Sequence, residues 1–228
     1  MPAEFDAYAD AYADQVKDPL RDCFAANSRF FDSRKLLLIR DFFRRRGQDT
    51  RALSWIDLGC GRGELLRLGQ PYFGVVAGCD PSSRMIQKCG NLNVRHQEFP
   101  DQIPFRSGTF HFATAVCAYH HVELPLHAAV TREVMRVLQP GGIFCMIEHN
   151  PFNPITQLIV RRSPVDVHAR LLTAGAATRL MRSVGARIIE TRYFLYFPER
   201  VYGSLVGMED RLARVPLGGQ FAVFGEKG

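Results

Sequence analysis

Along residues 53–150, short and almost unbroken apolar runs alternate with segments whose apolar residues recur at helical spacing. The apolar runs end at glycine, aspartate or a polar cluster, as strands do when a tight loop follows. Near-continuous apolar strands separated by helices are typical of a parallel sheet covered on both faces. The expected strands are 53–59, 72–80, 93–98, 110–118 and 142–148, and the expected helices are 63–69, 82–89 and 123–138.

The flanking segments continue the pattern. Near the start, Phe5, Tyr8, Ala9 and Tyr12 follow the spacing of one helical face. No repeat, low-complexity segment or linker divides the chain, so we predict one α/β domain with a seven-stranded sheet. Two more helical segments are expected, an apolar stripe at 35–43 and a helix at 176–184. The last two strands are expected at 186–197 and 218–227, with a helical insert between them.

Composition supports one sizeable core, since 46% of the 228 residues are hydrophobic. The formal net charge of +6 includes one dense run, Arg44–Arg46, which we interpret as a solvated helix face, with an acidic partner as the alternative. No pair of the six cysteines has CxxC spacing, which indicates reduced thiols in a cytoplasmic protein. The start has no signal-peptide pattern, and no apolar run reaches the ~18 residues that span a bilayer. We therefore expect no membrane association.

A glycine-rich loop carries the first functional signal. Gly59, Gly61 and Gly63 join the first strand to a helix, where a ligand can approach the backbone and unpaired N–H groups. The G-x-G-x-G spacing differs from the G-x-G-x-x-G of dinucleotide-binding proteins. Asp80 ends the second strand, where doubly wound folds place a carboxylate that accepts ribose hydroxyls. A tight turn and a helix cap are the structural alternatives for these residues.

Four ordered motifs resemble those of the class I S-adenosylmethionine-dependent methyltransferases. IDLGCGRGELL resembles their first motif, and GCDPSSRMI, IPFRSGTFHFATAVCAYHHV and LQPGGIF resemble later ones in the same order. The N-terminal FDAYADAYA is similar to the small-molecule branch (methyltransferase type 11, similar to enzymes of ubiquinone and menaquinone biosynthesis). The motifs are specific in combination, and the resemblance spans essentially the whole chain.

The resemblance implies a Rossmann-like, mostly parallel sheet with helices on both faces and an antiparallel last strand that forms a hairpin with the sixth. It divides the single domain 1–228 into an N-terminal helical lid at 1–50, a cofactor-binding half at 51–150, and a substrate-side half at 151–228 with its insert at 199–214. The implied cofactor is S-adenosylmethionine, and the product is S-adenosylhomocysteine. The expected cofactor-binding residues are Asp57, Gly59, Cys60, Gly61, Gly63, Asp80 with the ribose, Pro81, Met85 near the adenine, Glu98, Phe99 and Cys117.

Two positions depart from the family pattern. His111 replaces the usual Asp before the fourth strand, which affects packing more than chemistry. The third strand ends in Gln97-Glu98-Phe99, where the family commonly has an Asp for the adenine amino group. Glu98 is therefore the expected acceptor.

Polar residues after the fourth and fifth strands are the candidates for acceptor chemistry. A hydroxyl or ammonium acceptor must lose a proton, and a histidine with a pKa near neutrality can take it. His149 is our first choice for a base or substrate clamp, followed by His120 or His121. Bonding within the prolyl turn is the alternative for His149. The expected substrate-binding residues are Tyr8, Tyr12, Glu148, Asn150 and Tyr119.

Further side chains are candidates for contact with the acceptor, with core packing or a surface role as the alternative. Glu148 has an alternative role in orienting a histidine. Aromatic side chains from the N-terminal helices and the late insert are expected to pack, and a few of them can form a substrate wall. The aromatic set is Tyr8, Tyr12, Phe30, Phe31, Tyr193, Tyr196 and Tyr202, and the basic candidates for an acidic acceptor are Arg161, Arg162 and Arg200.

Two other interpretations of this region are disfavoured. His120, His121, Glu148 and His149 match no familiar zinc spacing, so no metal is expected. Asn150-Pro151-Phe152 is similar to the Asn-Pro-Pro-aromatic motif of nucleic-acid amino-methyltransferases, but it lacks the second adjacent proline and follows the fifth strand instead of the fourth.

The sequence therefore favours methylation of an oxygen, or else a nitrogen, of a small-molecule acceptor, in the biosynthesis of a secondary metabolite or modified glycan. No nucleic acid is expected as a partner, and the protein is expected to be a monomer or homodimer. Arg44–Arg46 leaves an RNA or protein methyltransferase as the alternative. A non-catalytic protein of the same fold is a second alternative, and a nicotinamide-dependent dehydrogenase is disfavoured by the glycine spacing.

Overall fold

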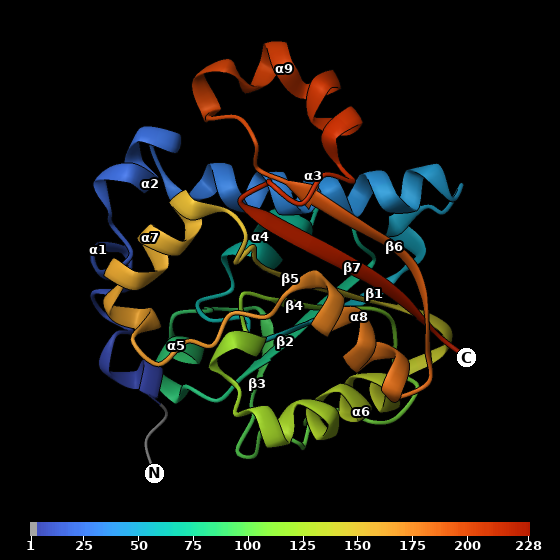
Figure 1. Ribbon diagram of the computed structural model, residues 1–228. Coiled ribbons are helices and arrows are strands. Elements are labelled where there is room, and N and C mark those ends of the chain that lie inside the picture. Colours follow the sequence, from blue (N-terminus) through green and yellow to red (C-terminus); the bar gives the residue numbers. More distant parts are fainter. Residues whose placement is uncertain (1–3) are drawn as a thin grey trace.

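The computed structural model describes residues 4–228 and shows a seven-stranded sheet with helices on both faces (Figure 1). Strands β1 to β5 are parallel, whereas β7 is antiparallel to both β5 and β6. The strand order is β3-β2-β1-β4-β5-β7-β6, so the predicted fold and hairpin are confirmed. The strands are β1 (Ser54–Leu58), β2 (Val75–Asp80), β3 (Asn93–His96), β4 (Phe110–Val116), β5 (Leu138–His149), β6 (Ala186–Phe194) and β7 (Gln220–Lys227).

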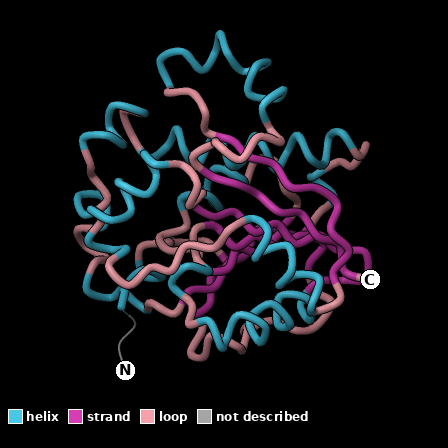
Figure 2. The backbone as a smooth tube through the Cα atoms, in the orientation of Figure 1, coloured by secondary structure: helices cyan, strands magenta, loops and turns pink. Residues whose placement is uncertain are grey.

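The strands form one continuous twisted band between the helices in Figure 2. Helices α1, α2 and α7 gather at one end of this band, and α9 projects beyond the β6–β7 hairpin (Figure 1). The helices are α1 (Tyr12–Gln15), α2 (Pro19–Phe24), α3 (Ser28–Arg45), α4 (Glu64–Gly69), α5 (Ser83–Gln87), α6 (His127–Val137), α7 (Pro154–Arg162), α8 (Ala174–Ser183) and α9 (Glu199–Leu212). Short 3₁₀ turns lie at η1 (Glu4–Ala7), η2 (Thr50–Ala52), η3 (Tyr119–His121), η4 (Leu124–Leu126) and η5 (Pro164–Asp166).

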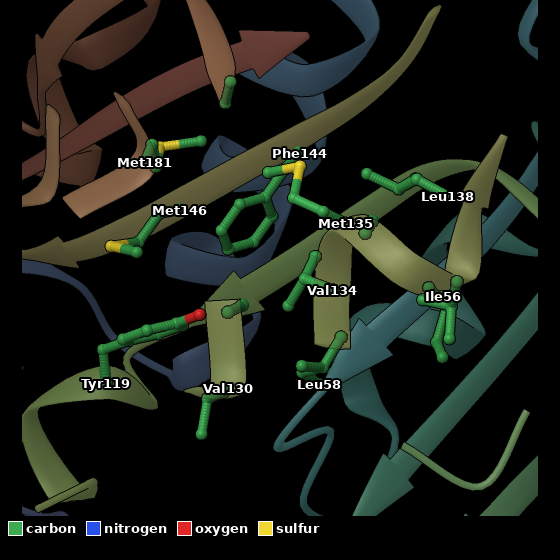
Figure 3. Close-up of a cluster of buried hydrophobic side chains, with 14 of the residues drawn as sticks. Ile56, Leu58, Tyr119, Val130, Val134, Met135, Leu138, Phe144, Met146 and Met181 are labelled. Atoms are coloured by element: carbon green, nitrogen blue, oxygen red, sulfur yellow. The ribbon is translucent and has the colours of Figure 1, made fainter. Parts of the chain in front are cut away.

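Two buried clusters sandwich the sheet because alternate residues of each strand face opposite sides. On one face, Phe42 of α3 stacks on Phe224 of β7 with ring centroids 4.1 Å apart. On the other face, Val134 of α6 and Met181 of α8 pack around Phe144 of β5 (Figure 3). Burial of this aliphatic and aromatic area is the main favourable term for the fold.

Two element predictions need correction. The apolar face from Phe5 to Tyr12 is divided between η1 and α1 by a turn, so it does not form one helix. The carboxylate of Asp6 holds η1 against α5, because it accepts hydrogen bonds from Ser82 Oγ (2.5 Å) and Arg84 N (3.1 Å). Strand β5 begins at Leu138, which pairs with Phe110, and so starts before the expected position at residue 142. Residues 1–3 of the expected lid lie outside the described residues.

Within residues 4–228, no helix is both long and apolar enough to cross a bilayer. The six cysteines are free thiols.

Candidate active site

A cavity of about 750 Å³ lies at the carboxyl ends of β1, β2, β4 and β5. Ligands of open α/β sheets bind at this edge, and the volume suits a small-molecule site of roughly 300–1,000 Å³. Its walls come from the strand ends and from α1, α2, α3 and α7. Predicted site residues that line it are Tyr12, Asp57, Gly59, Cys60, Gly61, Asp80, Pro81, Met85, Cys117, Tyr119, His120, His121 and His149.

The loop after β1 requires glycine for two different reasons. Gly63 has φ +75°, and a Cβ there would lie 2.5 Å from Leu92 Cδ1, so it permits close helix packing without lining the cavity. Gly61 has φ +54°, and a Cβ there would meet no described atom within 4 Å. The backbone at Gly61 is therefore open on its cavity side, as close approach of a ligand requires.

Asp80 at the end of β2 is held rigidly by the backbone. Its Oδ1 accepts a hydrogen bond from Ser82 N and its Oδ2 accepts one from Gly61 N, both at 2.8 Å. Burial raises the pKa of the carboxyl group, and the two backbone N–H groups partly offset that effect. Each carboxylate oxygen keeps a lone pair, so Asp80 can accept from two adjacent hydroxyls at the cavity wall.

The predicted adenine contacts at the end of β3 need correction. Glu98 and Phe99 are exposed and lie outside the cavity, whereas Gln97 is 6% exposed and lines it. The side chain of Gln97 is fixed by hydrogen bonds to Pro100 O (2.8 Å) and from Cys79 Sγ (3.3 Å). The chain bends at residues 98 and 99 just after β3, which leaves Gln97 facing the cavity and Glu98 and Phe99 exposed.

Asp57 lies under the glycine loop and is almost fully buried. It accepts a hydrogen bond from Thr114 Oγ1 (2.5 Å), which in turn accepts one from Trp55 Nε1 (2.7 Å). Burial raises the pKa of Asp57 to about 7, against the opposing effect of the Thr114 hydrogen bond. Asp57 thus ties β1 to β4 directly beneath the loop.

The polar residues after β5 divide into buried supports and cavity-facing groups, and Glu148 is a buried support. Its Oε1 accepts hydrogen bonds from Ala118 N (3.0 Å) and Tyr119 N (2.7 Å), and its Oε2 contacts His120 Nδ1 at 2.5 Å. Glu148 is fully buried and is absent from the cavity wall, so the predicted substrate contact is wrong and its alternative role in orienting a histidine is favoured. Tyr119 adjoins the cavity, but its hydroxyl hydrogen-bonds Thr131 Oγ1 in the core (2.9 Å).

Asn150 supports the turn instead of facing a ligand, which corrects a second predicted substrate contact. Its Nδ2 donates to Pro216 O (3.0 Å) and Gly218 O (2.8 Å), and its Oδ1 accepts from Phe152 N (3.1 Å). It is 1% exposed and does not line the cavity. The amide of Asn153 then caps α7 by accepting from Thr156 N (2.9 Å). These two asparagines and Pro154 hold the loop after β5 in place.

His120 and His149 lie side by side, with ring centroids 5.4 Å apart, but they differ in charge. Burial alone would lower the pKa of His120, but Glu148 and Asp166 outweigh it and raise that pKa to about 10. Burial, followed by the neighbouring charge of His120, lowers the pKa of His149 to about 4. At neutral pH His120 is therefore a buried cation, whereas His149 is a neutral imidazole at the cavity wall.

These opposite shifts predict a maximum of stability near pH 6.5. The folded chain holds the His120 proton up to about pH 10, whereas the unfolded chain holds it only up to about pH 6.5. The protonated His120 therefore contributes its full stabilisation below pH 6.5, and this stabilisation is lost as the pH rises toward 10. For His149 the unfolded chain binds a proton that the folded chain lacks between about pH 4 and 6.5, so stability increases with pH over that window. Glu148 and Asp166, whose pKa values are lowered, add to the loss of stability in acid.

Urea unfolding from pH 4 to 10 tests this prediction. His120→Gln should flatten the alkaline side of the profile, and His149→Gln should flatten part of the acid side. A wild-type profile that is level between pH 6.5 and 10 would contradict the assigned charge of His120.

Of the remaining residues that were predicted to contact the substrate, some line the cavity and others do not. Tyr8 does not line the cavity, and its hydroxyl donates to Pro164 O at 3.4 Å. Tyr12, Phe31 and Tyr196 line the cavity, whereas Phe30, Tyr193, Tyr202, Arg161, Arg162 and Arg200 do not.

Sequence reasoning missed several polar residues of the cavity, among them Lys35, Asp166 and Gln220. Lys35 is 9% exposed and forms an ion pair with Asp32 at 3.1 Å, and its place within an apolar helical stripe was a usable signal. Gln220 begins β7, and its buried Oε1 has no hydrogen-bond partner among the described residues. No local pattern marks Asp166, which the chain brings to His120 and His121 from 45 residues away.

Known proteins share both the sequence and the fold of this region. A family model for methyltransferase domains matches residues 56–146. An uncharacterized chloroplastic methyltransferase of Arabidopsis thaliana is 32% identical over 103 residues, which are 39% of this chain and 28% of that protein. The uncharacterized methyltransferase YcgJ of Bacillus subtilis is 32% identical over 109 residues, which are 44% of this chain and 42% of that protein. The chain thus matches less than half the length of each relative.

A solved structure extends the comparison to the fold. The crystal structure of an S-adenosylmethionine-dependent methyltransferase from Archaeoglobus fulgidus matches 90% of this chain and 97% of its own, with a TM-score of 0.63 and 18% identity. At that identity the likeness concerns the fold alone. Residues 56–146 thus match the methyltransferase-domain family, and the chain has the fold of an S-adenosylmethionine-dependent methyltransferase.

Proposed function

We propose that this protein transfers the methyl group of S-adenosylmethionine to an oxygen, or else a nitrogen, of a small-molecule acceptor. The observation that carries the proposal is one continuous cavity that joins the open backbone at Gly61 and the carboxylate of Asp80 to the neutral imidazole of His149. A cofactor site and a proton acceptor thus share one space, which methyl transfer to a protonated nucleophile requires.

The wall near β2 fits the cofactor. Asp80 offers two acceptor oxygens for ribose hydroxyls, and Gly61 leaves room for close approach to the backbone. Met85, 2% exposed, offers an apolar surface to the adenine. Gln97, which lines the cavity in place of the expected Glu98, offers the adenine a polar contact. When bound, S-adenosylmethionine supplies a methyl group activated by its sulfonium.

His149 is the proposed general base. It is neutral at physiological pH and can therefore accept the proton that a hydroxyl or ammonium acceptor loses. His120 cannot take that role at neutral pH because it already carries a proton between two carboxylates. The partnerless Oε1 of Gln220, which begins β7 opposite His149, can accept a hydrogen bond from the acceptor.

The acceptor is proposed to be small because secondary structure covers the cavity. Helices α1, α2 and α7 supply Tyr12, Phe24 and Ile159 to its wall, in line with a lid at 1–50 and a substrate-side half at 151–228. Closing these elements over the ligands would exclude water from the reaction.

An RNA acceptor is disfavoured by the surroundings of Arg44–Arg46. Arg44 and Arg45 form ion pairs with Asp41, and Arg46 lies 3.5 Å from Glu226. These carboxylates neutralise much of the charge that phosphate binding would need. Salt-dependent RNA retention is the discriminating experiment.

Replacing His149 with Ala should lower turnover by about 10²- to 10⁴-fold, the usual contribution of a general base. Affinity for S-adenosylhomocysteine should change little. Transfer of tritiated methyl to a panel of phenols, alcohols and amines measures the effect on any acceptor that the wild type uses. His168→Ala, an exposed histidine outside the cavity wall, is the matched control. Full turnover by the His149 variant would remove the general-base role.

A further inference from the structure

Three side chains converge at one end of the cavity without any shared sequence motif. His120 and His121 lie in η3 after β4, and Asp166 ends η5 after α7. Asp166 Oδ1 lies 3.4 Å from His120 Nε2 and 3.3 Å from His121 Nε2. All three residues line the cavity, so this cluster is accessible to a small ligand.

The two distances to Asp166 Oδ1 match the ligand separations of a tetrahedral metal ion. With ligand bonds of about 2.0–2.2 Å, neighbouring ligand atoms of a tetrahedral zinc site are about 3.3–3.5 Å apart. Both separations to Asp166 Oδ1 fall in this range, and the three atoms lie within 4.8 Å of one another. They are also longer than charge-assisted N–H···O hydrogen bonds, which are about 2.7–2.9 Å.

Glu148 supplies the outer support that a metal-binding histidine needs. Its carboxylate is hydrogen-bonded to Nδ1 of His120, and Nε2 of the same ring faces Asp166. Metal-binding histidines commonly make this bond from their other nitrogen to a carboxylate. Glu148 and Asp166 lie on either side of the His120 ring and favour a cation between them, and a dication would benefit more than a proton.

We propose that His120 Nε2, His121 Nε2 and Asp166 Oδ1 bind one divalent transition-metal ion of the zinc type. Three protein ligands leave a fourth position for a ligand from the cavity, as in catalytic zinc sites. The expectation of a metal-free site was based on four residues that did not include Asp166.

The open position identifies a class of acceptor, and this step rests on the proposed methyltransferase function. A metal ion lowers the pKa of a bound hydroxyl. The acceptor is therefore a hydroxyl compound: its O–H proton passes to His149 and its oxygen keeps the electron pair. The oxygen then forms a bond to the methyl carbon as the carbon–sulfur bond breaks and its electron pair stays on sulfur.

Metal binding is tested on untagged protein that has been stripped with a chelator and dialysed. Titration with Zn²⁺ should show one equivalent, and Co²⁺ should give the intense visible absorption of a tetrahedral site. His121→Ala and Asp166→Ala should each weaken Zn²⁺ binding at least about 100-fold, beyond the 10- to 100-fold typical of outer-shell changes. His168→Ala, an exposed histidine two residues from Asp166, should bind like the wild type.

Circular dichroism and melting curves of each variant separate loss of ligands from loss of fold. Absence of stoichiometric Zn²⁺ binding by the wild type would overturn the proposal, as would equal binding by the folded ligand variants. In that case the cluster is an ion pair of two histidines with Asp166. S-adenosylhomocysteine binding measured on the same samples reports separately on the methyltransferase proposal.

Discussion

Replacing Asp80 with Ala is expected to weaken binding of S-adenosylmethionine by at least about 100-fold. Two hydroxyl donors to a carboxylate contribute roughly 1.5–3 kcal/mol each, and 1.4 kcal/mol corresponds to a factor of ten. The same substitution also removes the acceptor for Gly61 N and Ser82 N, which fix the loops on either side of the site. Titration calorimetry with S-adenosylmethionine measures the loss.

Two matched variants sharpen this test. Asp80→Asn keeps one carbonyl oxygen and the side-chain size, so it should lose less affinity than Asp80→Ala. Asp101→Ala removes an exposed carboxylate from the loop after β3 and should leave affinity unchanged. Equal affinity of Asp80→Ala and the wild type would show that the ribose is not bound here.

The largest loss of stability is expected for Glu148→Ala. Removing one partner of a buried ion pair costs about 3–5 kcal/mol, because the other partner is left without compensation. In a chain of this size the melting temperature should fall by roughly 6–20 °C, since 1 kcal/mol corresponds to about 2–4 °C. The substitution also removes the acceptor for Ala118 N and Tyr119 N, which positions η3.

A double-mutant cycle shows whether this cost comes from the pair. The double variant Glu148→Ala, His120→Ala should lose less stability than the sum of the two single variants, because neither charge is then left unpaired. Glu98→Ala removes an exposed carboxylate and should change stability by less than about 0.5 kcal/mol. Strict additivity in the cycle would contradict the assigned His120–Glu148 interaction.

The sequence predicts the sheet well because its local patterns agree with its packing. Ile143, Cys145 and Ile147 face one buried cluster while Phe144 and Met146 face the other, so β5 appears as a continuous apolar run. The loop at Gly61 and the carboxylate of Asp80 are equally visible, since both follow strands directly.

Side-chain direction and long-range convergence are much less visible in the sequence. Whether Gln97 or Glu98 faces the cavity depends on the bend just after β3, which the sequence does not mark. The role of Glu148 depends on two backbone donors in the segment that follows β4, at Ala118 and Tyr119. Asp166 reaches the histidines only through the path of the chain after β5.

A crystal structure with S-adenosylhomocysteine bound tests the proposed site most directly. Both ribose hydroxyls should donate to Asp80, the adenine should contact Met85 and Gln97, and the sulfur should face the His149 side of the cavity. A nucleoside bound elsewhere, with Asp80 bonded only to Gly61 N and Ser82 N, would contradict it.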